Sequence, residues 1–148
     1  MNSENRSRHR AAARIAHHVA ALASDDKLHA ANAEAYLIRY YGARAVDQVL
    51  PVCDSPDHRA RYRAVWILGK SGDPRAFDTI LRLTKDPVGA VRYDATLALG
   101  HHGDPRAIEP LLALSNDRED EACIYGAAMS ALALMGYPVD DEELCATA

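Results

Sequence analysis

The amino-acid sequence predicts an all-α protein in which antiparallel helix pairs stack into a curved solenoid. The segment Gly69–Ala76, GKSGDPRA, returns 31 positions later as Gly100–Ala107, GHHGDPRA. Apolar residues within each copy follow the spacing of a helix face and not that of a strand. The 148 residues are 49% hydrophobic but only 6% aromatic and rich in alanine, which suits closely packed helices in one domain.

The repeat divides this single domain, 1–148, into a capping helix and four hairpins. The capping helix is expected over 1–25, and the repeats over 26–56, 57–87, 88–118 and 119–148. The first copy is degenerate, because Gly42-Ala43 replaces Asp-Pro, and the fourth aligns only at an offset of 33 residues. One hairpin cannot bury both faces of its helices, so neighbouring copies must stack.

Each helix is predicted from its apolar stripe, taken here in chain order. The capping helix has Ile15, Val19 and Leu22 on one side. The first helices of the second and third repeats carry Ala60, Ala64, Ile67 and Leu68, and Val91, Ala95, Ala98 and Leu99; the second helices carry Ala76, Phe77, Ile80 and Leu81, and Ala107, Ile108, Leu111 and Leu112. Residues 139–148 are expected to form a short acidic closing helix.

The turns within each hairpin have their own signals. Gly69 and Gly100 are expected to end the first helix in the left-handed conformation. Asp73 and Asp104 can cap the second helix, with Pro74 and Pro105 in its first turn, where a missing N–H costs nothing. Asp86 is expected to cap the next first helix.

The repeat from Ala95 to Leu114 resembles the HEAT-like repeats first grouped with phycocyanobilin lyase subunits, and the resemblance covers roughly residues 27–138. It implies a right-handed α-α superhelix whose second helices line a concave face used for protein recognition. Deoxyhypusine hydroxylase is similar in architecture but has His-Glu pairs where this chain has Tyr62-Arg63 and Tyr93-Asp94. That difference argues against hydroxylase activity.

A polar ladder is the most regular candidate site. Arginines at one register are followed three residues later by acids, giving Arg44 with Asp47, Arg75 with Asp78, and Arg106 with Glu109. One interpretation is that each arginine simply pairs with its own acid at i, i+3. The other is that the stripe is a docking strip on the concave face for a partner of mixed charge.

An apolar patch is the second candidate. Trp66 and Leu97 share a register that commonly holds a polar residue, and Tyr62 and Tyr93 lie one helical turn earlier. Exposed, these four side chains would anchor an interface. The alternative is burial between neighbouring first helices.

No cofactor, metal or catalytic group is expected. The adjacent pairs His17-His18 and His101-His102 lack the i, i+3 or i, i+4 spacing of helical metal ligands. Cys53, Cys123 and Cys145 match neither a disulfide framework nor a metal motif and are expected to be reduced and mostly buried. No secretory signal or membrane span is present, so the expected location is the cytoplasm.

The charge of the chain indicates which classes of partner it can bind. A net charge of -4 makes nucleic acid an improbable ligand, although Arg6, Arg8, Arg10 and Arg14 make the first residues basic. The last residues are acidic, so head-to-tail self-association is an alternative to simple solvated faces. The sequence therefore predicts a non-catalytic module for protein–protein interaction or scaffolding. An accessory subunit of a tetrapyrrole (phycobilin) lyase-type enzyme is the alternative, by resemblance alone.

Overall fold

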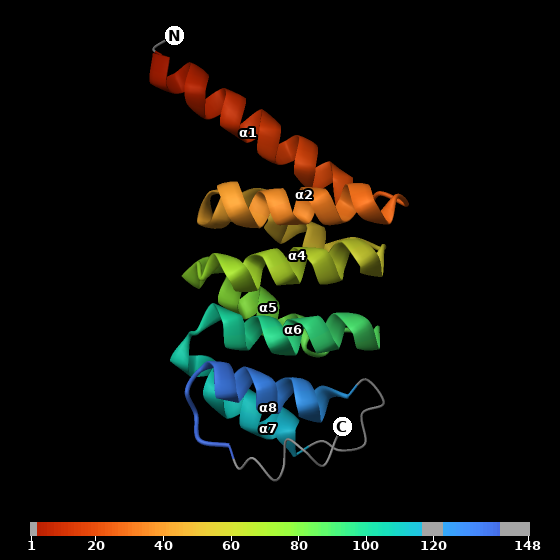
Figure 1. Ribbon diagram of the computed structural model, residues 1–148, viewed down its shortest axis with the longest axis vertical. Coiled ribbons are helices and arrows are strands. Elements are labelled where there is room, and N and C mark those ends of the chain that lie inside the picture. Colours follow the sequence, from red (N-terminus) through yellow and green to blue (C-terminus); the bar gives the residue numbers. More distant parts are fainter. Residues whose placement is uncertain (1–2, 117–122, 140–148) are drawn as a thin grey trace.

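Helices stacked in two layers make up the computed structural model, which describes residues 3–116 and 123–139 (Figure 1). The first layer contains α2 (Lys27–Tyr40), α4 (His58–Ser71), α6 (Gly89–His102) and α8 (Ile124–Leu134), stacked side by side in chain order. The second layer contains α3 (Val46–Val49) between the 3-10 turns η1 (Gly42–Ala45) and η2 (Leu50–Asp54), then η3 (Pro74–Ala76) with α5 (Phe77–Leu83), and η4 (Pro105–Ala107) with α7 (Ile108–Ser115). No strand occurs in the described ranges, and the all-α solenoid is confirmed.

Helix α1 (Ser3–Ala21) crosses one end of the stack obliquely (Figure 1). Ile15 and Leu22 are buried, and Val19 packs at the edge of the core, as the apolar stripe predicts. The Gln48 side-chain amide also donates to the Ala12 carbonyl oxygen at 3.3 Å. At the other end, residues 140–148 of the predicted closing helix lie outside the described part of the chain.

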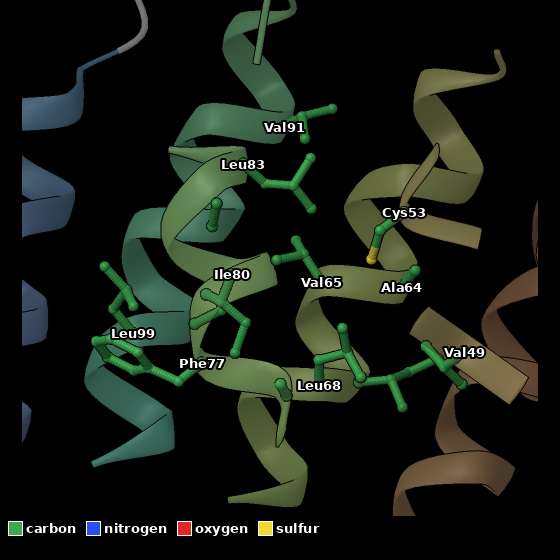
Figure 2. Close-up of a cluster of buried hydrophobic side chains, with 14 of the residues drawn as sticks. Val49, Cys53, Ala64, Val65, Leu68, Phe77, Ile80, Leu83, Val91 and Leu99 are labelled. Atoms are coloured by element: carbon green, nitrogen blue, oxygen red, sulfur yellow. The ribbon is translucent and has the colours of Figure 1, made fainter. Parts of the chain in front are cut away.

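The core runs continuously between the two layers. Figure 2 shows Val65 of α4 facing Ile80 of α5, with Leu99 of α6 beside Phe77 of α5, all of them buried. The same stripes that predict the helices therefore supply the core, and each repeat contributes side chains that its neighbours cover. This mutual cover is why the repeats stack in chain order.

The expected caps of the second helices are present. The Arg75 N–H donates to Asp73 Oδ1 at 3.0 Å, and the Arg106 N–H donates to Asp104 Oδ1 at 2.9 Å. Proline follows each aspartate and opens a short 3-10 turn before the α-helix begins.

The expectation that Gly69 and Gly100 end the first helices is wrong. Both are buried inside their helices, which continue to Ser71 and His102. The left-handed residue that follows each helix is the second glycine of the turn, Gly72 with φ 61° and its counterpart Gly103 with φ 75°. The first glycine instead lets the next helix approach, since a Cβ on Gly100 would lie 2.7 Å from the Ala131 Cβ.

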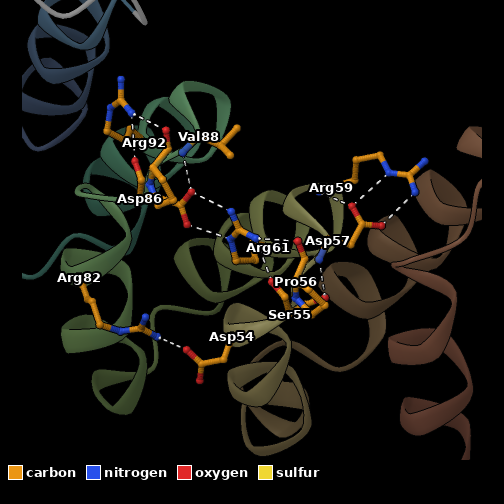
Figure 3. A network of polar contacts seen from close by, with 11 residues as sticks. Asp54, Ser55, Pro56, Asp57, Arg59, Arg61, Arg82, Asp86, Val88 and Arg92 are labelled. Atoms are coloured by element: carbon orange, nitrogen blue, oxygen red, sulfur yellow. Dashed lines mark hydrogen bonds and ion pairs between the residues drawn. The ribbon is translucent and has the colours of Figure 1, made fainter.

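Asp86 also differs from expectation, because Val88 and not Asp86 is the N-cap residue of α6. Asp86 Oδ1 accepts the Val88 N–H at 2.9 Å. Its carboxylate receives two further hydrogen bonds from the Arg61 guanidinium, at 2.8 and 2.9 Å (Figure 3). Arg61 reaches back to the carbonyl oxygens of Ser55 and Pro56 as well. Because Asp86 also accepts the Val88 N–H, this buried contact links α4 of the second repeat to the start of α6 in the third.

Candidate protein-interaction surfaces

The arginines of the polar ladder lie in the 3-10 turns that open the second-layer helices. Arg75 donates through Nε and Nη2 to the two oxygens of Asp73, at 3.0 and 2.8 Å, and also pairs with Asp47 of the preceding repeat. Arg106 binds Asp104 in the same bidentate way, at 3.1 and 2.7 Å. The expected pairing at i, i+3 is therefore replaced by pairing with the capping aspartate.

These bonds have an electrostatic consequence. Side-chain hydrogen bonds from Arg75 and Arg106, with their backbone N–H groups, lower the pKa of Asp73 and Asp104 to about 2. Both carboxylates thus stay charged at any physiological pH. Arg75 and Arg106 are thus bound to acceptors of the chain itself, and each holds its own turn together.

The rest of the ladder is uneven. Arg106 also stacks over the Phe77 ring, with its guanidinium carbon 4.2 Å from the ring centroid. Arg44 has no capping aspartate, because Gly42-Ala43 replaces Asp-Pro, and its guanidinium lies 5.9 Å from the Tyr41 ring. Asp78 and Glu109 are exposed at the start of α5 and α7. The structure therefore brings together Asp47 and Arg75 but does not join the six residues in one network.

The apolar patch is formed where α4 and α6 lie side by side. Trp66, Tyr62 and Leu97 are partly buried, and Tyr93 is 38% exposed. Tyr62 packs against the core, whereas Trp66, Tyr93 and Leu97 lie outside the core cluster. The outcome falls between the two alternatives of full exposure and full burial. Three partly exposed apolar side chains on two adjacent helices define the surface that we call the first-layer patch.

Two polar residues complete the first-layer patch. The Trp66 ring meets the His101 ring edge-on, with centroids 4.9 Å apart, and the Lys70 ammonium lies 4.7 Å from the Trp66 centroid. Lys70 Nζ is 3.0 Å from His101 Nδ1. Because the ammonium can only donate, His101 accepts and is neutral there. Burial and the nearby Lys70 charge lower the pKa of His101.

Sequence reasoning missed Lys70 and His101, although the repeat itself contained the signal. They occupy the same position of GKSGDPRA and GHHGDPRA, 31 residues apart, and therefore meet across adjacent helices. It also missed Glu34 of α2, a half-buried carboxyl near Arg63 and Asp94. Burial raises the pKa of Glu34, and the nearby Asp94 charge adds to this effect while Arg63 opposes it.

Asp94 is the more perturbed of these carboxyls, since burial raises its pKa to about 6. Arg63 is buried and donates to the Leu22 carbonyl oxygen at 2.7 Å, which holds the start of the solenoid against α4. Arg63 and Asp94 are the second residues of the pairs Tyr62-Arg63 and Tyr93-Asp94, and here they are a structural cation and a half-buried carboxyl.

Metal and membrane signals are absent from the described residues. Over 3–116 and 123–139, no three His, Cys, Asp or Glu side chains are grouped closely enough to bind a metal ion. His102 Nε2 donates to the Asp73 carbonyl oxygen at 2.9 Å, a structural use of one histidine of the pair. None of the helices in these ranges combines the length and apolar character needed to cross a bilayer.

A family model describing HEAT repeats matches residues 15–88 and 46–133, which together cover most of the chain and all of α2 to α7. The chain belongs to the HEAT-repeat family. HEAT repeats generally mediate protein–protein interaction or scaffolding through the faces of their stacked helices. No curated protein matches the sequence significantly. The family assignment therefore explains the stacked hairpins and leaves the partner open.

Proposed function

We propose that this HEAT-repeat protein is a non-catalytic interaction module that docks another protein on the first-layer patch. The observation that carries the proposal is the contrast between the two candidate surfaces. Arg75 and Arg106 of the ladder are bound by carboxylates of the chain itself, whereas Trp66, Tyr93 and Leu97 are partly exposed and lie outside the core. Partly exposed aromatic side chains are typical anchors of protein interfaces.

The patch also has a charge preference. Lys70 is exposed at its edge and makes no ion pair among the described residues. A partner segment with an apolar anchor for the Trp66–Leu97 surface and a carboxylate for Lys70 would fit this arrangement. We place the module in the cytoplasm, where free thiols such as Cys53 and Cys123 stay reduced.

Trp66 makes the proposal directly testable, because it is the only tryptophan of the chain. A partner captured from the native host should, once purified, change the Trp66 fluorescence on binding. Trp66→Ala and Leu97→Ala should each weaken binding by about tenfold or more, the effect of removing an interface anchor.

Matched controls are available on the same layer. Tyr40→Ala and Leu134→Ala remove exposed side chains from α2 and α8, at 57% and 55% exposure, and should leave the affinity unchanged. If Arg75→Ala or Glu109→Ala abolishes binding while Trp66→Ala does not, docking belongs to the polar ladder and the proposal fails.

An accessory role in tetrapyrrole attachment is the second candidate, and one groove favours it. About 810 Å³ lies between α5, the loop after it and α7, lined by Leu81, Leu83, Pro87, Pro110 and Leu114 with charged residues at its rim. Ligand pockets commonly have volumes of about 300–1,000 Å³. Phycocyanobilin should then shift its absorption on mixing with the protein. Ala113→Glu, in the groove, should abolish the shift, and Ala133→Glu, on α8, should not.

A further inference from the structure

Four arginines that make no ion pair with the carboxylates of residues 3–116 and 123–139 line one side of the solenoid's first end. Arg6, Arg10 and Arg14 recur every four residues along α1 and therefore share one helix face, and Arg44 follows in η1. One groove of about 270 Å³ is lined by Ser7, Ala11 and Tyr41 together with Arg10, Arg14 and Arg44; a second is lined by Ser3, Ser7, Arg6 and Arg10. We call Arg6, Arg10, Arg14 and Arg44 the arginine strip.

The strip contrasts with five arginines further along the chain. Arg59, Arg61, Arg75, Arg82 and Arg106 each pair with an aspartate. No strip arginine lies within ion-pair distance of a carboxylate in the described residues, and all four are exposed. The only acid of α1 is Glu4, in its first turn. Since Arg6 and Arg14 are about 12 Å apart along the helix, their charges combine into one positive surface.

The chain's own charge distribution supplies a complementary ligand. Residues 1–24 contain four arginines and one glutamate, for a net charge of +3. Residues 117–148 contain one arginine and eight acids, for a net charge of -7, including the run Asp140-Asp-Glu-Glu143. Residues 25–116 contain twelve basic and twelve acidic side chains and are neutral. The two ends of the chain are thus oppositely charged, with a balanced middle.

Within one molecule the two ends cannot meet. Figure 1 shows α1 and α8 at opposite ends of the stack. Three helix-to-helix spacings of about 8–10 Å separate α2 from α8, or roughly 24–30 Å. From Val139, four residues extend at most about 14 Å. The acidic run can therefore reach an arginine strip only on another copy.

We infer that the arginine strip binds the acidic segment Asp140–Glu143 of a second copy, so that HEAT solenoids associate head to tail. Guanidinium groups spaced one helical turn apart offer bidentate hydrogen bonds to successive carboxylates. Because the two contacting surfaces are different, the contact is heterologous and builds a ring or an open array. The strip lies on α1 and η1, away from the first-layer patch, so this inference is independent of the proposed docking function.

Sedimentation velocity of the full chain tests the inference. Wild-type protein should show concentration-dependent association at about 10 mM salt that weakens about tenfold or more at about 150 mM, where the Debye length is only about 8 Å. Arg10→Glu should abolish it. Arg8→Glu is the matched control, because Arg8 makes the same charge change on the opposite face of α1 and should leave association intact.

A charge swap separates the contact from general repulsion. Protein with Arg6, Arg10 and Arg14 changed to Glu, and protein with residues 140–143 changed to Lys, should each associate less than wild type and should co-assemble when mixed. Circular dichroism should show both to be folded. The inference is overturned by monomeric wild-type protein at low salt, by salt-independent association, by equal effects of Arg8→Glu and Arg10→Glu, or by nucleic acid that binds the strip in place of a second copy. Trp66→Ala should leave self-association unchanged, so failure here and failure of the docking proposal are distinguishable.

Discussion

Gly69 of α4 and Ala98 of α6 lie so close that a Cβ on the glycine would be 2.7 Å from the alanine Cβ and 2.8 Å from its backbone oxygen. Gly100 and Ala131 repeat this contact between α6 and α8. Gly69 and Gly100 occupy the same position of the repeat, so the same close contact occurs twice. In α2 the corresponding residue is Ile38, so this close contact belongs to the later repeats.

Replacing Gly69 with alanine should therefore destabilise the fold even though alanine favours helices. The new methyl group would meet backbone atoms of Ala98, which cannot rotate away, at an expected cost of about 1–3 kcal/mol in the free energy of unfolding. Urea denaturation measures this change in the free energy of unfolding. Gly126→Ala, inside α8 with no atom within 4 Å of its Cβ position, should instead stabilise by roughly 0.5–1 kcal/mol. Equal effects of the two substitutions would contradict the close-packing explanation.

The Arg61–Asp86 contact should be the most valuable ion pair of the described chain. Their side chains are only 11% and 5% exposed, so Arg61→Leu leaves the Asp86 charge buried and should cost about 3 kcal/mol. Arg82→Ala removes an ion pair of 2.8 Å whose side chains are 55% and 68% exposed, and should cost about 0.2–1 kcal/mol. Thermal and urea unfolding of both variants checks the order, and a larger loss for Arg82→Ala would show that burial is not the deciding factor.

Asp94 should make the protein less stable as the pH rises from about 4 to 6. Burial raises its pKa to about 6, above the value of 3.8 expected in the unfolded chain, so in this range the folded state binds the proton more tightly. Asp94→Asn should accordingly raise the free energy of unfolding by about 1–2 kcal/mol at pH 7, with the gain fading towards pH 4. A gain that is the same at pH 4 and pH 7 would exclude ionisation as its cause.

Asp73 and Asp104 should make stability depend on pH in the opposite direction to Asp94. Asp73 and Asp104 have pKa values lowered to about 2 by their arginine hydrogen bonds, so their stabilising effect is complete above about pH 4 and is lost as the pH falls towards 2. Unfolding free energies of wild type and Arg106→Ala, measured from pH 5 to pH 2, should converge at the acid end. A constant difference between them would contradict this linkage.

The two described cysteines should differ sharply in reactivity. Cys53 is buried against the core and its pKa is raised to about 12 by burial, whereas Cys123 is exposed, contrary to the expectation of mostly buried thiols. Only the thiolate reacts with alkylating agents, so iodoacetamide at about pH 8 should label Cys123 rapidly and Cys53 only on unfolding. Peptide mass spectrometry measures the extent of labelling at both cysteines. Rapid labelling of Cys53 in native protein would show that the second layer opens around it.

At the candidate site, the sequence pattern predicts which residues share a position in the repeat but not which partner each side chain binds. The ladder register of Arg75 and Arg106 is visible in the sequence, but their choice of partner is not, because the capping aspartate two residues earlier competes with the acid three residues later. The repeat boundaries and the docking role of either surface remain predictions. Lys70 and His101 could have been found, since residues one repeat apart on first helices become neighbours.

By itself the sequence determined the helix pairs, their order, the aspartate caps of the second helices and the buried stripes, because local hydrogen bonding and the periodicity of apolar residues decide these within one repeat. Tertiary structure decided the rest. Whether Gly69 ends a helix or admits its neighbour, which carboxylate Arg61 reaches, and how much of Trp66 stays exposed all depend on how closely adjacent hairpins approach. The distance between adjacent hairpins is set by packing between repeats, so it cannot be predicted from the sequence of one repeat alone.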